Sequence, residues 1–290
     1  MAADFRDRVV HHLVYDWIAP TFERQFLHDS YSCRKGKGTL FGIRRVEGFL
    51  RAASDDMRRD CWVLRLDISG FFMAIDRARL FALVQKGLGV VLVDPGLLDF
   101  LLRTLVFADP LAGARFRGSP TDWEGLPSDK SLQGSAPGCG LPIGNLTSQL
   151  FANIYLNPLD QFVKRELKLR WYGRYVDDMV FLHPDRAVLA AAIGQVRDFL
   201  RDRLGLRLHP RKVHLQPAAH GFPFLGVYVL PFRTYAGRRV VANFRAALRD
   251  ELQNPNPVPH PNNKLEQARL RSYRGLLAHH NCRKLATVCS

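Results

Sequence analysis

The sequence predicts an α+β fold, because strand-like runs that carry carboxylates are set among segments with helical spacing. The first run, 62–66, is apolar and is followed directly by Asp67. The second run, 171–182, has apolar stretches on both sides of Asp177 and Asp178, and it predicts a strand, a tight turn and a second strand. Apolar residues at helical spacing predict helices over 5–26, 40–55 and 147–167, and a further helix after residue 72.

The composition indicates a folded and strongly basic protein. The chain has 290 residues, of which 47% are apolar, and this argues against disorder. Its 42 Lys and Arg exceed its 27 Asp and Glu, so the formal net charge is +15. Such a charge favours a polyanionic partner over an acidic protein or a neutral metabolite. A non-catalytic basic RNA-binding protein is therefore an alternative that the charge leaves open.

Cysteine usage and hydropathy predict a cytoplasmic protein without a membrane partner. The odd number of cysteines, without paired metal-ligand spacing, is not typical of a secreted disulfide framework. These cysteines are Cys33, Cys61, Cys139, Cys282 and Cys289. We find no run of about 18 uncharged apolar residues. Because Asp4 precedes any apolar segment, a signal peptide is not expected either.

The three carboxylates Asp67, Asp177 and Asp178 have the character of metal ligands. Asp177 and Asp178 are adjacent like charges beside apolar residues, where unpaired ionised groups cost several kcal/mol. A divalent cation would remove this conflict, whereas the simpler interpretation is an exposed hairpin turn, in which Asp is common. Asp67 fits a metal ligand at the edge of a sheet, or else the N-cap of the following helix.

Five blocks of the sequence resemble, in order, the motifs of reverse transcriptases. Asp67 with its neighbours Ile68, Phe71 and Phe72 resembles the first metal-binding motif, and 175–178 resembles the second. Three further blocks resemble the template-contacting motif, the palm lysine and the primer grip, respectively: 140–149, Lys212 and 224–226. The resemblance covers roughly residues 30–285. It implies an RNA-directed DNA polymerase with a right-hand fold of fingers, palm and short helical thumb.

One block is most similar to the reverse transcriptases of diversity-generating retroelements. Most of the family has Gln-Gly at the start of the template-contacting block and Ser-Pro at its end, where this chain has Ile143-Gly144 and Ser148-Gln149. Segments 126–132 and 272–279 also resemble that group. The resemblance implies mutagenic retrohoming, in which a template-repeat RNA is copied with errors at template adenines. A retron-type or defence-associated reverse transcriptase is the alternative.

The resemblance implies a division into fingers, palm, a fingers element or insertion, palm and thumb, at 1–60, 61–89, 90–139, 140–232 and 233–290 respectively. In the palm, an antiparallel sheet would be covered on one face by the helix after residue 72 and the helix over 147–167. Residues 109–140 are rich in Gly, Pro and Ser, which predicts a functional loop near nucleic acid or else a passive surface insertion.

The last segment, 233–290, is strongly basic, with eleven Lys or Arg against three Asp or Glu. Prolines within 254–261 separate two predicted helices, near 243–253 and 264–280. A basic thumb that grips a duplex has this composition, and so does a solvated amphipathic helix pair.

The resemblance also implies the cofactors and partners. Asp67, Asp177 and Asp178, helped by the Ile68 carbonyl, would bind two Mg²⁺ ions, with Mn²⁺ as a possible substitute. Lys212 would be the fourth catalytic residue, acting on the departing pyrophosphate, although a plain surface lysine fits the sequence equally well. The implied partners are template RNA, a cDNA or primer strand, dNTPs and a small basic helical-bundle accessory protein, and the implied source is bacterial, archaeal or phage.

Further residues are candidates for substrate contact. Glycines in the basic loop 30–39 would let backbone amides and cations approach phosphates together, although an ordinary flexible loop has the same composition. By resemblance, Phe72 is a steric gate against a 2′-hydroxyl, or else a core residue. The candidates for dNTP or template binding are Arg34, Lys35, Lys37, Gly70, Phe71, Phe72, Ile143, Gly144, Ser148 and Gln149. The predicted primer grip comprises Tyr175, Phe224, Leu225 and Gly226.

Overall fold

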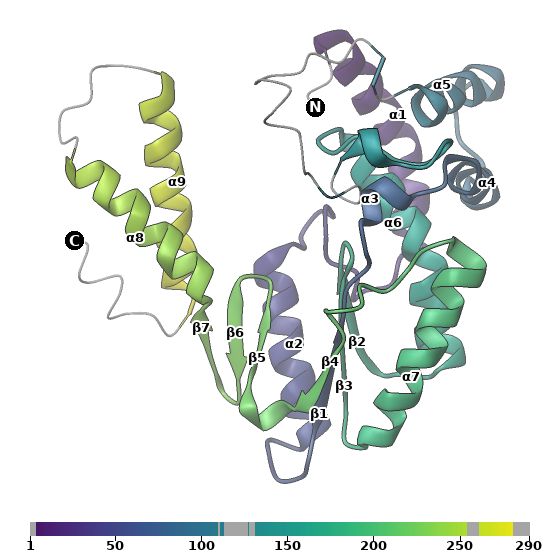
Figure 1. The fold of residues 1–290 in the computed structure, drawn as a ribbon. Coiled ribbons are helices and arrows are strands. Elements are labelled where there is room, and N and C mark those ends of the chain that lie inside the picture. Colours follow the sequence, from purple (N-terminus) through teal and green to yellow (C-terminus); the bar gives the residue numbers. More distant parts are fainter. Residues whose placement is uncertain (1–3, 110, 113–126, 128–130, 254–260, 281–290) are drawn as a thin grey trace.

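The structure, a computed structural model, describes residues 4–109, 111–112, 127, 131–253 and 261–280 (Figure 1). Two antiparallel sheets form its framework, which confirms the predicted α+β class. The larger sheet has the order β2-β3-β1-β4, with strands Trp171–Tyr175, Asp178–His183, Trp62–Leu66 and His214–Pro217. The smaller sheet has the order β5-β6-β7, with strands Phe222–Phe224, Val227–Leu230 and Arg233–Ala236.

The register of the larger sheet determines which side chains share a face. Leu66 on β1 lies opposite Met179 on β3, and both side chains are buried on the first face. Because side chains alternate along a strand, Val63 and Val180 point to the second face, where they join a separate buried cluster. Both faces of the sheet are therefore covered.

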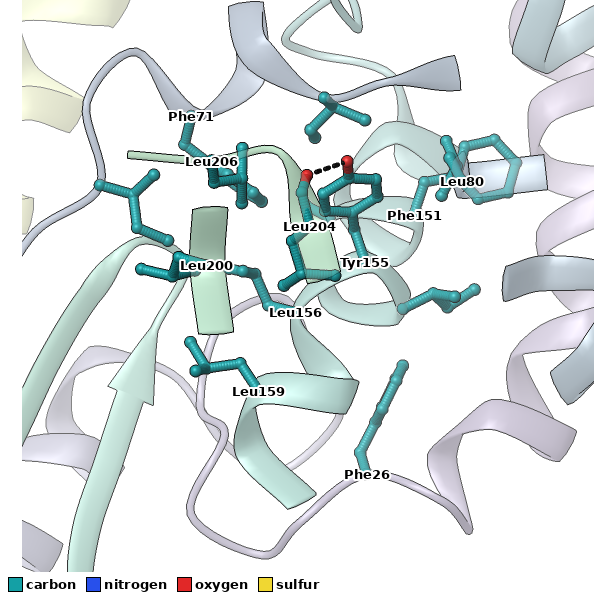
Figure 2. Close-up of a cluster of buried hydrophobic side chains, with 14 of the residues drawn as sticks. Phe26, Phe71, Leu80, Phe151, Tyr155, Leu156, Leu159, Leu200, Leu204 and Leu206 are labelled. Carbon is teal, nitrogen blue, oxygen red and sulfur yellow. Dashed lines mark hydrogen bonds between the residues drawn. The ribbon is translucent and has the colours of Figure 1, made fainter. Parts of the chain in front are cut away.

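Helices α6 and α7 cover the first face (Figure 1). Helix α6 is Leu146–Gln161 and continues through the π-helical turn η4, Phe162–Glu166, while α7 is Arg186–Phe199 and continues through η5, Leu200–Leu204. Tyr155 on α6 is fully buried and donates a 2.6 Å hydrogen bond to the Leu204 carbonyl, as Figure 2 shows. This bond satisfies the hydroxyl inside an otherwise apolar cluster and joins the two helices.

The expectation that the helix after residue 72 covers the sheet is wrong. That segment forms the short α3, Phe71–Ala74, and then α4, Arg77–Gly87, which packs against α5 and α6. Helix α7 contacts β1 and β3 in its place. Helix α5, Pro95–Phe107, was not predicted, although Asp94 caps it by accepting a bond from the Leu97 amide.

Helix α2, Thr39–Ser54, covers the second face together with the smaller sheet (Figure 1). Ile43, Val46 and Leu50 are buried there because their spacing places them on one side of the helix. Helix α1, Phe5–Glu23, packs against α6 and α5 on the other side of the molecule. The helices predicted over 5–26 and 40–55 are thus present as α1 and α2.

Helices α8, Arg238–Gln253, and α9, Pro261–Ala278, form a pair beyond β7 (Figure 1). They share a small core that includes Phe244, Ala247, Leu270 and Leu277. Helix α8 begins five residues before the predicted start at 243. Short 3-10 turns occur at Leu132–Gly134 and Ala218–His220. The prolines at 255, 257 and 259 lie outside the described residues, and so do residues 110, 113–126 and 128–130 of the loop predicted over 109–140, which include four residues of segment 126–132.

Candidate active site

The turn between β2 and β3 carries Asp177, and Asp178 follows it as the first residue of β3. Val176, which precedes them, has φ 54°, a left-handed conformation that is rare for a β-branched residue. The Arg174 guanidinium donates a 2.9 Å bond from Nη1 to the Val176 carbonyl. The backbone of this turn is therefore held by a side chain of the preceding strand.

Asp67 reaches the same place from β1. It follows Leu66 directly, and since Leu66 pairs with Met179, Asp67 lies beside Asp178 across the β1–β3 pair. The two carboxyl groups interact directly, since the proximity of Asp67 raises the pKa of Asp178. The structure thus brings together the three carboxylates that the sequence predicts as a group.

Burial and mutual repulsion make ionisation of Asp177 and Asp178 unfavourable. Burial, aided by repulsion from Asp67 and Asp178, raises the pKa of Asp177 to about 6. The pKa of Asp178 is also raised, chiefly because neighbouring protein atoms remove part of its hydration, and in addition by the charge of Asp67. The Lys212 ammonium offsets part of this repulsion, because its Nζ donates a 2.8 Å hydrogen bond to Asp67 Oδ2. That hydrogen bond raises the pKa of Lys212 in turn.

A cavity lies beside this group, between the larger sheet and the turn that joins β5 to β6. Its lining consists of Arg65, Leu66, Asp67, Asp178, Met179, Lys212, Pro223, Phe224, Leu225 and Gly226. Leu225 and Gly226, with φ 47° and 84°, form the left-handed turn. Three of the four predicted primer-grip residues thus face the carboxylates across the cavity, whereas Tyr175 packs against the cluster on the second face.

Sequence reasoning missed Arg65. It lies two residues before Asp67 on β1, so its side chain shares that residue's face of the sheet and lines the cavity. Burial lowers the pKa of Arg65, although the charges of Asp178 and Asp67 oppose this. The sequence contained a usable signal, because Arg65 lies two positions before the predicted metal ligand Asp67, and residues two apart on a strand point to the same face.

Comparison with known proteins agrees with this arrangement. Residues 2–229 match the family described as "Reverse transcriptase (RNA-dependent DNA polymerase)". The chain belongs to the reverse transcriptase family. The Escherichia coli (strain K12) protein YkfC is 25% identical to this reverse transcriptase over 284 residues, which cover 84% of this chain and 68% of YkfC.

Solved telomerase structures resemble it in fold. The apo telomerase of Candida tropicalis, truncated from its C-terminal domain, aligns with 81% of this chain at a TM-score of 0.50 and 11% identity. The telomerase of Candida albicans, solved with a fragment of telomeric RNA, aligns with 84% of this chain at a TM-score of 0.47 and 11% identity. The chain spans 49% and 42% of those two telomerase chains. The right-hand polymerase fold predicted from the sequence is confirmed.

The carboxylate group fits a divalent cation by its chemistry. Reverse transcriptases generally use divalent metal ions, and carboxylate oxygens are the ligands that hard cations prefer. Within the described part of the chain, however, no cluster of three or more His, Cys, Asp or Glu side chains is arranged to hold an ion. Since Lys212 is bonded to Asp67, metal binding requires Asp67 to release or share that partner.

The basic loop over 30–39 has two cations that are engaged within the protein. The Arg34 side chain is only 5% exposed and bonds to Glu23 Oε2 at 2.8 Å and to the Leu27 carbonyl at 2.6 Å. Lys37 donates to the His28 carbonyl, and burial lowers its pKa to about 8. Lys35 is exposed. In this reverse transcriptase, Arg34 therefore stabilises the loop through its bonds to Glu23 and Leu27, whereas Lys35 faces solvent.

Phe72 and the template-contacting block are joined directly. The Leu141 amide donates a 2.9 Å bond to the Phe72 carbonyl, and the Phe72 ring lies 5.3 Å from the Phe71 ring, centroid to centroid. Phe71 is buried in the core, whereas Phe72 is half-buried. Gly70, with φ 51°, makes the turn into α3.

The four candidates within the template-contacting block differ in exposure. Ile143 is 54% exposed and Gly144 is exposed with φ 115°. Ser148 is buried and Gln149 is half-buried in the first turn of α6. Ile143 and Gly144 are therefore the two candidates of this block that solvent or a ligand can reach.

In the described residues, we find no helix that is long and apolar enough to cross a membrane.

Proposed function

We propose that this chain is an RNA-directed DNA polymerase whose catalytic centre is formed by Asp67, Asp177 and Asp178. The observation that carries the proposal is the convergence of these three carboxylates from segments far apart in the sequence: Asp67 and Asp178 line one cavity, and Asp177 lies close enough to feel the charges of both. Membership of the reverse transcriptase family supports it. The shared cavity is consistent with Phe224, Leu225 and Gly226 contacting the primer strand.

The roles of the central residues follow from their chemistry. Asp67, Asp177, Asp178 and the Ile68 carbonyl would hold divalent cations, two Mg²⁺ or Mn²⁺ ions. When bound, such ions lower the pKa of the primer 3′-hydroxyl and neutralise the triphosphate. Lys212 Nζ, already positioned by Asp67, would donate a hydrogen bond or a proton to an oxygen of the leaving pyrophosphate.

The surrounding residues would select and orient the substrates. The Phe72 ring would exclude a ribonucleotide 2′-hydroxyl, and the absent side chain of Gly144 would leave room for the template base. Lys35, which is exposed, is the better candidate for phosphate contact than Arg34, whose donors are already used. The basic helices α8 and α9 would grip the template–primer duplex through its phosphates.

We also propose that the enzyme is error-prone and serves a diversity-generating retroelement. The support is the sequence of the template-contacting block, in which Ile143 and Gln149 depart from the usual family residues. These two residues would loosen the grip on the nascent base pair. A template-repeat RNA and a small basic helical-bundle accessory protein would be the partners.

Primer extension with sequencing of the product tests both levels of the proposal. The purified chain, with its accessory protein where one is encoded nearby, would receive a primed RNA of defined sequence, Mg²⁺ and dNTPs. We expect cDNA whose errors concentrate opposite template adenine, and fewer of them in Ile143→Gln with Gln149→Pro. cDNA without errors, or with errors spread evenly over all template bases, would instead favour a retron-type or defence-associated enzyme. RNA binding without any synthesis would favour a non-catalytic RNA-binding protein.

A further inference from the structure

Arg174 on β2 is a fully buried cation whose guanidinium is paired with a fully buried carboxylate. Its Nε and Nη2 donate to the two oxygens of Asp160 on α6, at 2.8 Å and 2.6 Å. The Tyr172 hydroxyl donates to Asp160 Oδ1 at 2.7 Å. Attraction to Asp160 outweighs the effect of burial, so the pKa of Arg174 is raised and the side chain stays charged. A buried ion pair is costly in itself, because both partners lose their hydration.

The remaining donors of Arg174 reach the catalytic turn and the fingers. Nη1 donates to the Val176 carbonyl at 2.9 Å, and Nη2 donates to Ser30 Oγ at 3.2 Å. The Arg174 backbone is also bonded to the fingers, since its amide donates to the Asp29 carbonyl and its carbonyl accepts from the Tyr31 amide, both at 2.9 Å. One guanidinium therefore connects α6, the fingers loop and the turn that carries Asp177.

The bond to Val176 acts on a strained part of the backbone. Val176 has φ 54°, a conformation in which its branched side chain clashes with the neighbouring backbone. Its carbonyl belongs to the peptide group that leads into Asp177. A donor that fixes this carbonyl fixes the plane of that peptide, and with it the direction in which the Asp177 side chain leaves the turn.

We propose that Arg174, anchored by Asp160, is a positioning residue that holds the Val176–Asp177 peptide so that the Asp177 carboxylate faces Asp67. The inference rests on the proposed polymerase function. The competing interpretation is that the ion pair only fastens α6 to β2. Two apolar residues of similar volume would do that equally well, because replacing a buried ion pair in this way is often neutral or stabilising.

The double variant Asp160→Leu with Arg174→Met separates the two interpretations. It removes the hydrogen bond to the Val176 carbonyl but leaves an apolar contact between α6 and β2. We expect a melting temperature and an affinity for RNA/DNA duplex close to those of the unmodified chain. The rate of single-nucleotide incorporation should nevertheless fall, by about 100-fold if Asp177 is displaced by about 1 Å. A folded, duplex-binding double variant that incorporates nucleotides at the unmodified rate would overturn the proposal.

Two single variants complete the test. Tyr172→Phe removes a bond to Asp160 but leaves the bond to Val176, so its incorporation rate should stay close to that of the unmodified chain. If the double variant does not fold, Arg174→Lys distinguishes the two interpretations. This variant keeps the positive charge but loses the planar guanidinium that donates to Asp160 and Val176 at the same time. We expect slow incorporation, and an unmodified rate in this variant would contradict the proposal.

Hydrogen exchange of residues 175–179 provides a readout that does not need activity. In the double variant, or in Arg174→Lys, these amides should exchange faster while those of β1 are unchanged. If the unmodified chain makes no DNA but its turn still loosens in this way, the polymerase function fails and the positioning role stands. An unchanged exchange rate in the turn would contradict the positioning role whatever the activity.

Discussion

Lys212 Nζ lies 2.8 Å from Asp67 Oδ2, so the predicted general acid is bonded to a predicted metal ligand. The ammonium thus occupies part of the space and cancels part of the charge that a cation would use. Lys212 and the metal are expected to compete for Asp67 in the free protein and to separate when substrate phosphates arrive.

Substitution Lys212→Met should therefore have two opposite effects. The removal of a competing positive charge should lower the Mg²⁺ concentration needed for half-maximal incorporation. The loss of the group that assists the pyrophosphate should lower the maximal rate, by a factor on the order of 10²–10⁴. A Mg²⁺ titration of single-nucleotide incorporation measures both quantities. A lower rate with an unchanged Mg²⁺ requirement would show that Lys212 does not compete for the site.

Gly42 should not accept a side chain without a loss of stability, because Tyr31 fills the space that the side chain would need. A Cβ built on Gly42 would lie 2.8 Å from Tyr31 Cδ2. Gly42→Ala should destabilise the protein by about 1–3 kcal/mol, since overpacking of a buried contact forces neighbours to move. Gly48→Ala is a matched control in the same helix, α2, where no described atom lies within 4 Å of the added Cβ. Urea unfolding should leave this control as stable as the parent or more so.

His11 should make stability depend on pH. It is buried, its Nδ1 lies 2.5 Å from Thr147 Oγ1, and its pKa is lowered below 6.5 chiefly by burial. The unfolded chain therefore binds a proton more readily, so stability is complete above about pH 6.5 and falls as the pH drops toward the folded pKa. Unfolding measured across this range should show a shallower loss in His11→Gln. The exposed His220→Gln, which lies outside this contact, serves as a control.

Phe72→Ala should weaken the discrimination between dNTPs and rNTPs if the ring acts as a steric gate. The ring is half-buried beside Phe71, so some loss of stability is also expected. Phe71→Leu provides the comparison, because Phe71 is buried in the core and its loss should affect stability without changing sugar selection. Incorporation rates for both nucleotide types measure the effect. Unchanged rejection of ribonucleotides in Phe72→Ala would make Phe72 a packing residue.

The hairpin and its carboxylates could be predicted from the sequence because their signals are local. Apolar residues on both sides of Asp177 and Asp178 indicate two strands and a turn, and β2 and β3 lie there. Strands β5, β6 and β7 are three or four residues long, too short for an alternating pattern to be recognised. Helix α7 carried a usable signal in its N-cap, Asp185, which accepts from the Ala187 amide.

Pairings between distant side chains could not be predicted. Arg34 sits in a loop whose composition suggests phosphate binding, yet the fold places Glu23 against it. Arg174 is close to Asp177 in the sequence, but its partner Asp160 is reached only because α6 packs behind β2. Residue types indicate which groups need a partner, while the tertiary structure decides which partner each one finds.

The comparison of Asp177→Asn with the unmodified chain tests the central claim most directly. The exchange removes one negative charge from the carboxylate group and leaves the shape of the side chain almost unchanged. The measurement is single-nucleotide incorporation on a primed RNA template with Mg²⁺, together with the affinity for that template. We predict that incorporation is lost in Asp177→Asn while template affinity is retained. Incorporation at the unmodified rate would contradict the assignment of Asp67, Asp177 and Asp178 as the catalytic centre.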